Sequence, residues 1–142
     1  MAQRTEAASG LQGRSAMPHR LLLVDDETPI LFAMANYFRA KGYVVDAARE
    51  REEAEALLTN VSYAAIIVDL RMTAVHGADG LEVVVYARER CPSARIIVLT
   101  AYGSPAAEAE ARARGADAFL HKPQPLADLA QLLEALLGKH ES

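Results

Sequence analysis

The sequence has little cysteine and no long apolar run. Cys91 is the single cysteine of 142 residues, so no internal disulfide can form, which excludes a disulfide-stapled secreted scaffold and is typical of a reducing compartment. No apolar stretch approaches the length that spans a membrane, and the first residues lack the hydrophobic core of a secretory signal. We therefore expect a cytoplasmic protein that does not enter a membrane.

Positive charge is also scarce. Lys and Arg number 15 against 19 Asp and Glu, which gives a net charge of -4, and no dense basic stripe is present. This balance disfavours direct nucleic-acid binding by the domain. The patterns G-x-x-x-x-G-K-[ST] and G-x-G-x-x-G are missing, which argues against a nucleotide or flavin binder.

What the chain does contain is the composition of one ordered globular domain. It is 51% hydrophobic and 24% charged, and its length suits one domain with a real core. We place this domain at residues 20–138, with a flexible N-terminal tail over 1–19 and a short tail over 139–142. The first tail is interpreted as a frayed end, although its Arg, Ser and Ala content has a faint similarity to an organelle transit peptide.

Unbroken apolar runs mark the strands. Residues 64–68 are apolar without alternation and stop at Asp69, which predicts a strand buried on both faces. Similar runs predict further strands at 20–25, 95–100 and 117–121, and a short one at 43–47.

Helical patterns alternate with these strands. Thr28 is expected to cap a first helix that Gly42 ends, and Ser104 is expected to cap a later one. The other helices are expected over 49–59, between Gly80 and Pro92, and over 126–137. Five strand–helix alternations with short connections require a parallel sheet covered on both faces, so the fold class is α/β.

Polar residues close the strands, and they are Asp25, Asp26, Asp69, Thr100 and Lys122. The carboxyl ends of parallel strands meet at one edge of the sheet, where open α/β folds bind ligands. Carboxylates at ~4 Å repel by roughly 4 kcal/mol per pair at an effective dielectric near ~20. A hard divalent cation with oxygen ligands is therefore expected there, and Lys122 adds a fixed positive charge.

Four motifs at these strand ends resemble the receiver domain of two-component response regulators. They are the segments 23–27 (LVDDE), 68–72 (VDLRM), 99–101 (LTA) and 121–123 (HKP). The resemblance extends over 20–138 and implies a CheY-like, flavodoxin-like (βα)5 sandwich with strand order 2-1-3-4-5. It also implies a phospho-acceptor signalling module whose own chemistry is limited to self-phosphorylation and autodephosphorylation.

By the same resemblance, Asp69 would accept a phosphoryl group from a sensor histidine kinase or a histidine phosphotransfer protein. Mg2+ would be held by Asp26 and Asp69 and by the backbone carbonyl of Arg71, and Asp25 would assist through a water molecule. Phosphorylation would switch a surface that binds a downstream protein target. Whether the chain is a stand-alone receiver or a fragment of a longer regulator stays open, as does a homodimer through the fourth and fifth helices.

The resemblance assigns the remaining motif residues to the phosphoryl group and to a switch. Lys122, Thr100 and the backbone N–H of Ala101 would contact the phosphoryl oxygens. Phe119 matches an aromatic switch position, expected to turn inward when Thr100 moves, and it is equally well explained as ordinary core. The Lys122-Pro123 peptide bond is expected to be cis.

The segment after Asp69 departs from the family pattern. Thr73 stands where the family usually has proline, and the helix-opening pair Asp79-Gly80 arrives three residues late. Residues 73–78 are therefore expected to form a lengthened loop, at a cost of only a few tenths of a kcal/mol in closure entropy. Arg71 and Tyr102 are bulky and are expected to shield the acyl phosphate from water.

Other residues and other functions have simpler or weaker interpretations. His76 and His121 lack metal-ligand spacing and are expected to be solvated, and Arg88 with Arg90 is expected to form an exposed helix face. A Mg2+-dependent phosphohydrolase usually needs a second acid two residues after its nucleophile, where this chain has Arg71. An intact acidic site argues against a scaffold that works without phosphorylation.

Overall fold

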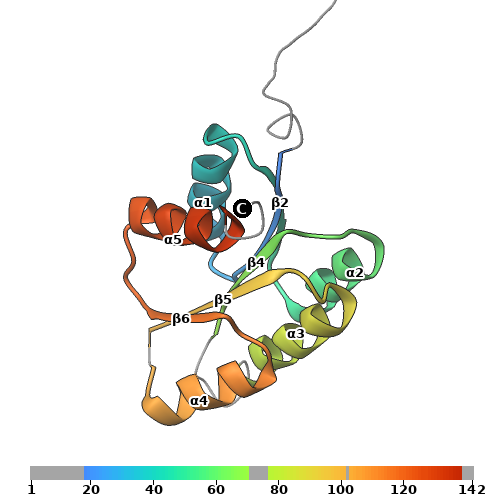
Figure 1. Ribbon diagram of the computed structural model, residues 1–142, viewed down its shortest axis with the longest axis vertical. Helices are drawn as coiled ribbons and strands as arrows, with labels where there is room; N and C mark the ends of the chain where they lie inside the picture. The colour runs from blue at the N-terminus through green and yellow to red at the C-terminus, as the bar shows by residue number, and fades with distance from the viewer. Residues whose placement is uncertain (1–17, 71–76, 102, 139–142) are drawn as a thin grey trace, which may run out of the picture.

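The computed structural model describes residues 18–70, 77–101 and 103–138, and in this part of the chain five strands alternate with five helices. The strands are β2 (Arg20–Val24), β3 (Val44–Ala48), β4 (Ala65–Asp69), β5 (Arg95–Thr100) and β6 (Ala118–His121). The helices are α1 (Thr28–Ala40), α2 (Arg51–Asn60), α3 (Gly77–Arg90), α4 (Pro105–Arg114) and α5 (Leu126–Gly138). Neighbouring strands all pair in parallel in the order β3-β2-β4-β5-β6. This is the expected 2-1-3-4-5 order of a doubly wound α/β fold (Figure 1).

The sheet is covered on both faces because its central strands are apolar on both sides. Side chains alternate along a strand, so Ile67 of β4 packs with α1 and α5, whereas Ile66 and Val68 pack with α2, α3 and α4. All positions of β4 are buried, which explains its unbroken apolar run. Figure 1 shows α1 beside α5 on one face of the sheet and α2 beside α3 on the other. Among the described residues, no helix combines the length and the apolar character needed to cross a membrane.

Helix ends confirm one predicted cap and correct another. The Ser104 side chain accepts a hydrogen bond from the N–H of Ala107 and caps α4, as expected. The prediction for Thr28 is wrong, because Glu27 is the N-cap of α1, without a side-chain cap bond, and Thr28 is the first residue inside the helix. The spacing of apolar residues in the sequence does not show whether Thr28 precedes the helix or is its first residue.

Helix α3 begins earlier than the sequence indicated. It starts at Gly77, so the expected lengthened loop over 73–78 is shorter at its far end. The rest of that loop, with Arg71, Thr73 and His76, lies outside the described residues.

Arg88 corrects the expectation of an exposed helix face. Its guanidinium donates to the carbonyl oxygens of Pro92 (2.8 Å), Ala94 (2.9 Å) and Gly115 (2.7 Å) and to Oδ2 of Asp117 (2.9 Å). The same Asp117 oxygen accepts from the N–H of Ile96 at 2.8 Å. Arg88 therefore joins the ends of α3 and α4 to the amino ends of β5 and β6, whereas Arg90 is exposed as expected.

Candidate functional site

The polar residues that close the strands come together at the carboxyl edge of the sheet. Asp25 follows β2, Asp69 and Thr100 end β4 and β5, and Lys122 follows β6. Asp25 is 4% exposed, Asp69 9% and Thr100 0%, so these polar side chains are buried at the end of an apolar sheet. The N–H of Lys122 donates to the carbonyl of Thr100 at 2.7 Å, which ties the residue after β6 to β5.

The ammonium group of Lys122 stands among three carboxylates. Its Nζ lies 2.9 Å from Oδ1 of Asp69, 3.7 Å from Oδ2 of Asp25 and 3.7 Å from Oε1 of Glu27. Burial on its own lowers the pKa of Lys122, but the hydrogen bond to Asp69 and the negative charges of Asp25, Asp69 and Glu27 outweigh it. The pKa of Lys122 therefore lies above its ordinary value, and the side chain is a fixed positive charge at neutral pH.

Asp25 is the acid of this group whose ionised form is disfavoured. Burial raises its pKa from 3.8 to about 6, the hydrogen bond from the N–H of Glu27 works in the opposite direction, and repulsion by Asp69 adds to the rise. That N–H donates to Oδ1 of Asp25 at 2.8 Å and fixes the carboxylate toward the site. A bound cation would relieve the repulsion that raises this pKa.

The donor set fits a hard divalent cation. One carboxylate oxygen from each of Asp25, Glu27 and Asp69 lies within 4.8 Å of the others. Oδ2 of Asp69 is buried and has no hydrogen-bond partner in the part of the chain that the structure describes. Buried carboxylate oxygens without partners are costly, and oxygen ligands of this kind are those that Mg2+ and Ca2+ prefer. Three carboxylates and one ammonium group leave two negative charges in excess, which a divalent cation would neutralise.

Glu27 is the acid of this group whose role was not predicted from the sequence. Its signal was the acidic run from Asp25 to Glu27, in which three successive carboxylates follow one strand. Asp26, the expected cation ligand, is exposed and lines the adjoining pocket. Arg71, whose carbonyl was expected to complete the ligand set, lies outside the described residues.

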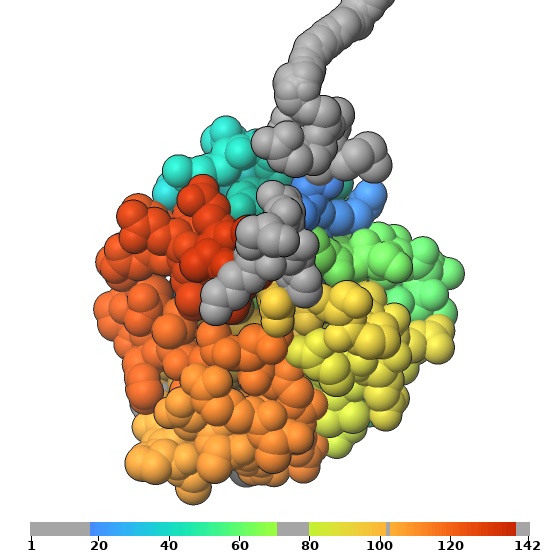
Figure 2. Space-filling view, in the orientation of Figure 1, coloured from blue at the N-terminus to red at the C-terminus, as the bar shows by residue number. Residues whose placement is uncertain are grey.

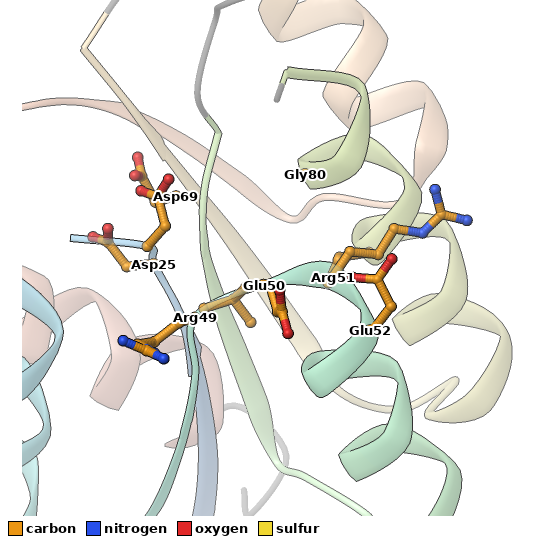
Figure 3. Close-up of a pocket in the computed structure, with 10 residues that line it drawn as sticks. Asp25, Arg49, Glu50, Arg51, Glu52, Asp69 and Gly80 are labelled. Atoms are coloured by element: carbon orange, nitrogen blue, oxygen red, sulfur yellow. The ribbon is translucent and has the colours of Figure 1, made fainter. Parts of the chain in front are cut away.

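A pocket of about 290 Å³ adjoins the acids. Its lining combines strand-end residues with the start of α2 and one turn of α3, namely Val24, Asp25, Asp26, Arg49, Glu50, Arg51, Glu52, Asp69, Gly80 and Val83. Figure 3 shows the carboxylates of Asp25 and Asp69 side by side, while the guanidinium group of Arg51 points away from them. The pocket is therefore negative at the end where the strands stop.

The other motif residues surround the end of β5 and β6. Phe119 is 7% exposed and belongs to the core beneath α4, so its ring points inward. The Lys122-Pro123 bond is cis, as expected. His121 is exposed, but its ring meets that of Phe119 edge-on, with centroids 5.7 Å apart at 84°. The exposure of His121 agrees with the expectation of a solvated side chain, and the period-2 spacing of β6 places its ring beside Phe119. Tyr102 lies outside the described residues.

Comparison with known proteins follows the same lines. The chain matches the response regulator receiver domain family over residues 21–134. It is 40% identical over 122 residues to the photosynthetic apparatus regulatory protein RegA of Cereibacter sphaeroides. This alignment covers 86% of this chain and 63% of that protein. It is 34% identical over 123 residues to the response regulator MprA of Mycobacterium sp. (strain KMS), covering 87% of this chain and 52% of that protein. The chain thus spans between half and two thirds of the length of these relatives.

Solved structures with the same fold include receiver proteins. A CheY-like receiver domain protein from Methanospirillum hungatei superposes with a TM-score of 0.80 at 27% identity, over 88% of this chain and 98% of that one. A response regulator from Burkholderia pseudomallei, whose crystal structure holds a phosphorylated aspartic acid, a calcium ion and citrate, has a TM-score of 0.75 at 28% identity. That match covers 87% of this chain and 71% of the other.

Proposed function

Because this chain belongs to the response regulator receiver family of two-component signal transduction, we propose that Asp69 is the aspartate that accepts the phosphoryl group. The observation that carries the proposal is the 2.9 Å contact between Nζ of Lys122 and Oδ1 of Asp69. It puts a fixed positive charge beside a buried carboxylate at the edge of a parallel sheet, among other acids. Phosphorylation of an aspartate in the Burkholderia pseudomallei relative supports the same chemistry here.

In the transfer itself, a carboxylate oxygen of Asp69 attacks the phosphorus of a phosphohistidine on the donor protein. A P–O bond to Asp69 forms as the P–N bond breaks, and the imidazole of the donor keeps the electron pair. Such in-line transfers depend on positioning and on charge stabilisation more than on covalent help from the protein. Lys122 supplies that charge from one side, and Thr100 and the backbone N–H of Ala101 hold the transferred oxygens from the other.

Asp25, Asp26, Asp69 and the carbonyl of Arg71 are proposed as the residues that hold Mg2+. When bound, Mg2+ neutralises the acids and the phosphoryl oxygens. Glu27 joins these residues because one of its oxygens lies in the same cluster as those of Asp25 and Asp69. The Burkholderia pseudomallei structure holds a calcium ion as well as a phosphorylated aspartic acid, which supports a divalent cation in this family.

The partners we propose are a sensor histidine kinase or a histidine phosphotransfer protein as donor and a downstream protein as target. Phosphorylation shifts an existing equilibrium between two conformers, and a hundredfold shift needs roughly 2.7 kcal/mol of differential stabilisation. Helix α4 is suited to move, because Ala111 is its one buried residue. Phe119 lies beneath α4 and is proposed to move together with Thr100.

The test is labelling with acetyl phosphate and Mg2+, followed by intact-protein mass spectrometry. The wild type is expected to gain one phosphoryl group, and Asp69→Asn none. Glu52→Gln is the matched control, because Glu52 lines the same pocket away from Lys122. Labelling of Asp69→Asn at the rate of the wild type would refute Asp69 as acceptor.

A further inference from the structure

The imidazole of His121 lies directly against the backbone of Gly103. A Cβ atom added at Gly103 would stand 2.6 Å from Cδ2 of His121 and 3.1 Å from Cε2 of Phe119, and it would also collide with Nε2 of His121. Real Cβ atoms do not approach other atoms so closely. The ring can therefore rest there because residue 103 has no side chain.

His121 also reaches the other end of the same short segment. In the sheet, His121 of β6 is the register partner of Thr100 of β5. The N–H of the next residue, Lys122, donates to the carbonyl of Thr100 at 2.7 Å. His121 of β6 thus meets Thr100 through backbone pairing and Gly103 through its side chain.

This segment connects the phosphorylation site to α4. Thr100 and Ala101 are the proposed contacts of the phosphoryl group, and Ser104, directly after Gly103, caps α4 through the N–H of Ala107 at 3.1 Å. Ala111 is the one buried residue of α4, and Ala107 of its first turn packs partly buried against the same core, so the connection through Gly103 and Ser104 adds to a small set of contacts that position this turn. The space-filling view shows α4 at the lower rim of the molecule, below α5 (Figure 2).

We propose that His121 is a positioning residue for phosphoryl binding. Its imidazole clamps Gly103 against Phe119 and so fixes the path of the segment that carries Thr100 and Ala101. The clamp sets how well this segment receives the phosphoryl group and how far that event reaches α4. The inference rests on the proposed function, since it assigns a role in the binding of the group that Asp69 accepts.

Binding of Mg2+ alone and of beryllofluoride with Mg2+ tests the clamp, since beryllofluoride mimics the phosphoryl group. Titration calorimetry measures the first affinity and fluorine NMR of bound fluoride the second. His121→Ala is expected to weaken beryllofluoride binding about three- to tenfold and to leave Mg2+ affinity unchanged, because the acids are untouched. A merely structural role would lower the thermal midpoint without separating the two affinities.

A double-mutant cycle sharpens the test. Gly103→Ala is expected to weaken beryllofluoride binding like His121→Ala, because the new methyl group displaces the imidazole. In the His121→Ala background the same change is expected to have little further effect, since the clashing ring is gone. His19→Ala is the matched control, because that histidine lies before β2 and its ring is tilted against that of Tyr43, with centroids 6.5 Å apart.

The outcomes separate the clamp from the function on which it rests. A wild type that does not bind beryllofluoride with Mg2+ contradicts the proposed function. Hydrogen exchange of the Gly103 and Ser104 amides without any ligand then still tests the clamp, which predicts faster exchange in His121→Ala. Unchanged beryllofluoride affinity in both variants, additive effects in the cycle, or equal losses of Mg2+ and beryllofluoride affinity would each overturn the clamp.

Discussion

The carboxylate of Asp25 is held by the backbone of Glu27, whose N–H donates to Oδ1 of Asp25 at 2.8 Å. The bond keeps the buried acid turned toward Asp69 and Lys122, although burial favours its neutral form. Because the folded-state pKa is raised from 3.8 to about 6, the folded protein keeps a proton in this range that the unfolded chain has released. Stability without Mg2+ is therefore expected to fall as the pH rises from about 4 to about 6.

Asp25→Asn is expected to remove this pH dependence. At pH values above about 6 and without Mg2+, it is expected to raise the free energy of unfolding by about 1–3 kcal/mol, since about two pKa units are relieved. The gain is expected to vanish below about pH 3, where the wild-type acid is protonated in both the folded and the unfolded state. Urea denaturation across this range measures it. A variant less stable than the wild type at neutral pH would contradict the assignment of a disfavoured charge to Asp25.

Lys122→Met is expected to have opposite effects on two properties. Loss of the ammonium makes the acid cluster more negative, so Mg2+ is expected to bind more tightly, while acetyl phosphate labelling slows at least about tenfold for lack of charge stabilisation. Calorimetry and timed labelling measure the two. Lys41→Met is the control, because Lys41 lies over the ring of Tyr37, with Nζ 5.5 Å from its centroid. Weaker Mg2+ binding in Lys122→Met would refute this electrostatic account.

Glu27→Gln is expected to weaken Mg2+ binding about three- to tenfold, because one charge at about 5 Å from a divalent ion is lost in a near-aqueous dielectric. The backbone bond to Asp25 is kept, and Glu27 is 49% exposed, so the fold should be little affected. Glu52→Gln, in the first turn of α2, is the matched control. Equal Mg2+ affinity in Glu27→Gln and the wild type would remove Glu27 from the cation site.

Arg88→Met is expected to lower the free energy of unfolding by about 2–3 kcal/mol, because it leaves three carbonyl groups without their side-chain donor and removes the ion pair with Asp117, whose carboxylate keeps only the hydrogen bond from the N–H of Ile96. Acetyl phosphate labelling of the folded variant should persist. Arg90→Met is the control, with a change expected within about 0.5 kcal/mol, since that side chain is exposed. Similar losses in the two variants would mean that the Arg88 contacts contribute nothing specific.

Ser104→Ala is expected to cost about 1 kcal/mol, because α4 loses its N-terminal cap. Faster hydrogen exchange at the amide of Ala107 would locate the effect. Thr28→Ala serves for comparison and is expected to cost less than about 0.5 kcal/mol, since Thr28 lies inside α1 and caps nothing. A larger loss in Thr28→Ala than in Ser104→Ala would reverse the two assignments.

The strands and the strand-end residues could be predicted because their signals are local. A run of apolar residues ending at Asp69 identifies a doubly buried strand, and parallel pairing then brings Asp69 and Lys122 to one edge without any knowledge of the side-chain contacts. The strand order itself came from the family resemblance. The positions of the strands and of their terminal polar residues can therefore be predicted from stretches of four to six residues each.

Contacts across long stretches of chain could not be predicted in this way. Arg88 and Asp117 are 29 positions apart and meet through a long side chain whose spacing resembles that of a solvated one. The approach of His121 to Gly103 is possible because glycine has no side chain, and the hydrophobic periodicity of the sequence does not indicate such a contact. The role of Glu27 depends on a backbone turn that directs alternate acids of one run to different sides.

The two ends of the sheet differ in role: Arg88 stabilises the fold at the amino ends of the strands, and the candidate site lies at their carboxyl ends. The bonds of Arg88 gather the amino ends of β5 and β6, whereas the acids and Lys122 stand at the opposite rim. Substitutions at the charged rim are therefore expected to change Mg2+ binding and acetyl phosphate labelling while the Arg88 contacts at the other end stay intact. A design that alters the site should therefore change residues around Asp25, Asp69 and Lys122 and keep Arg88.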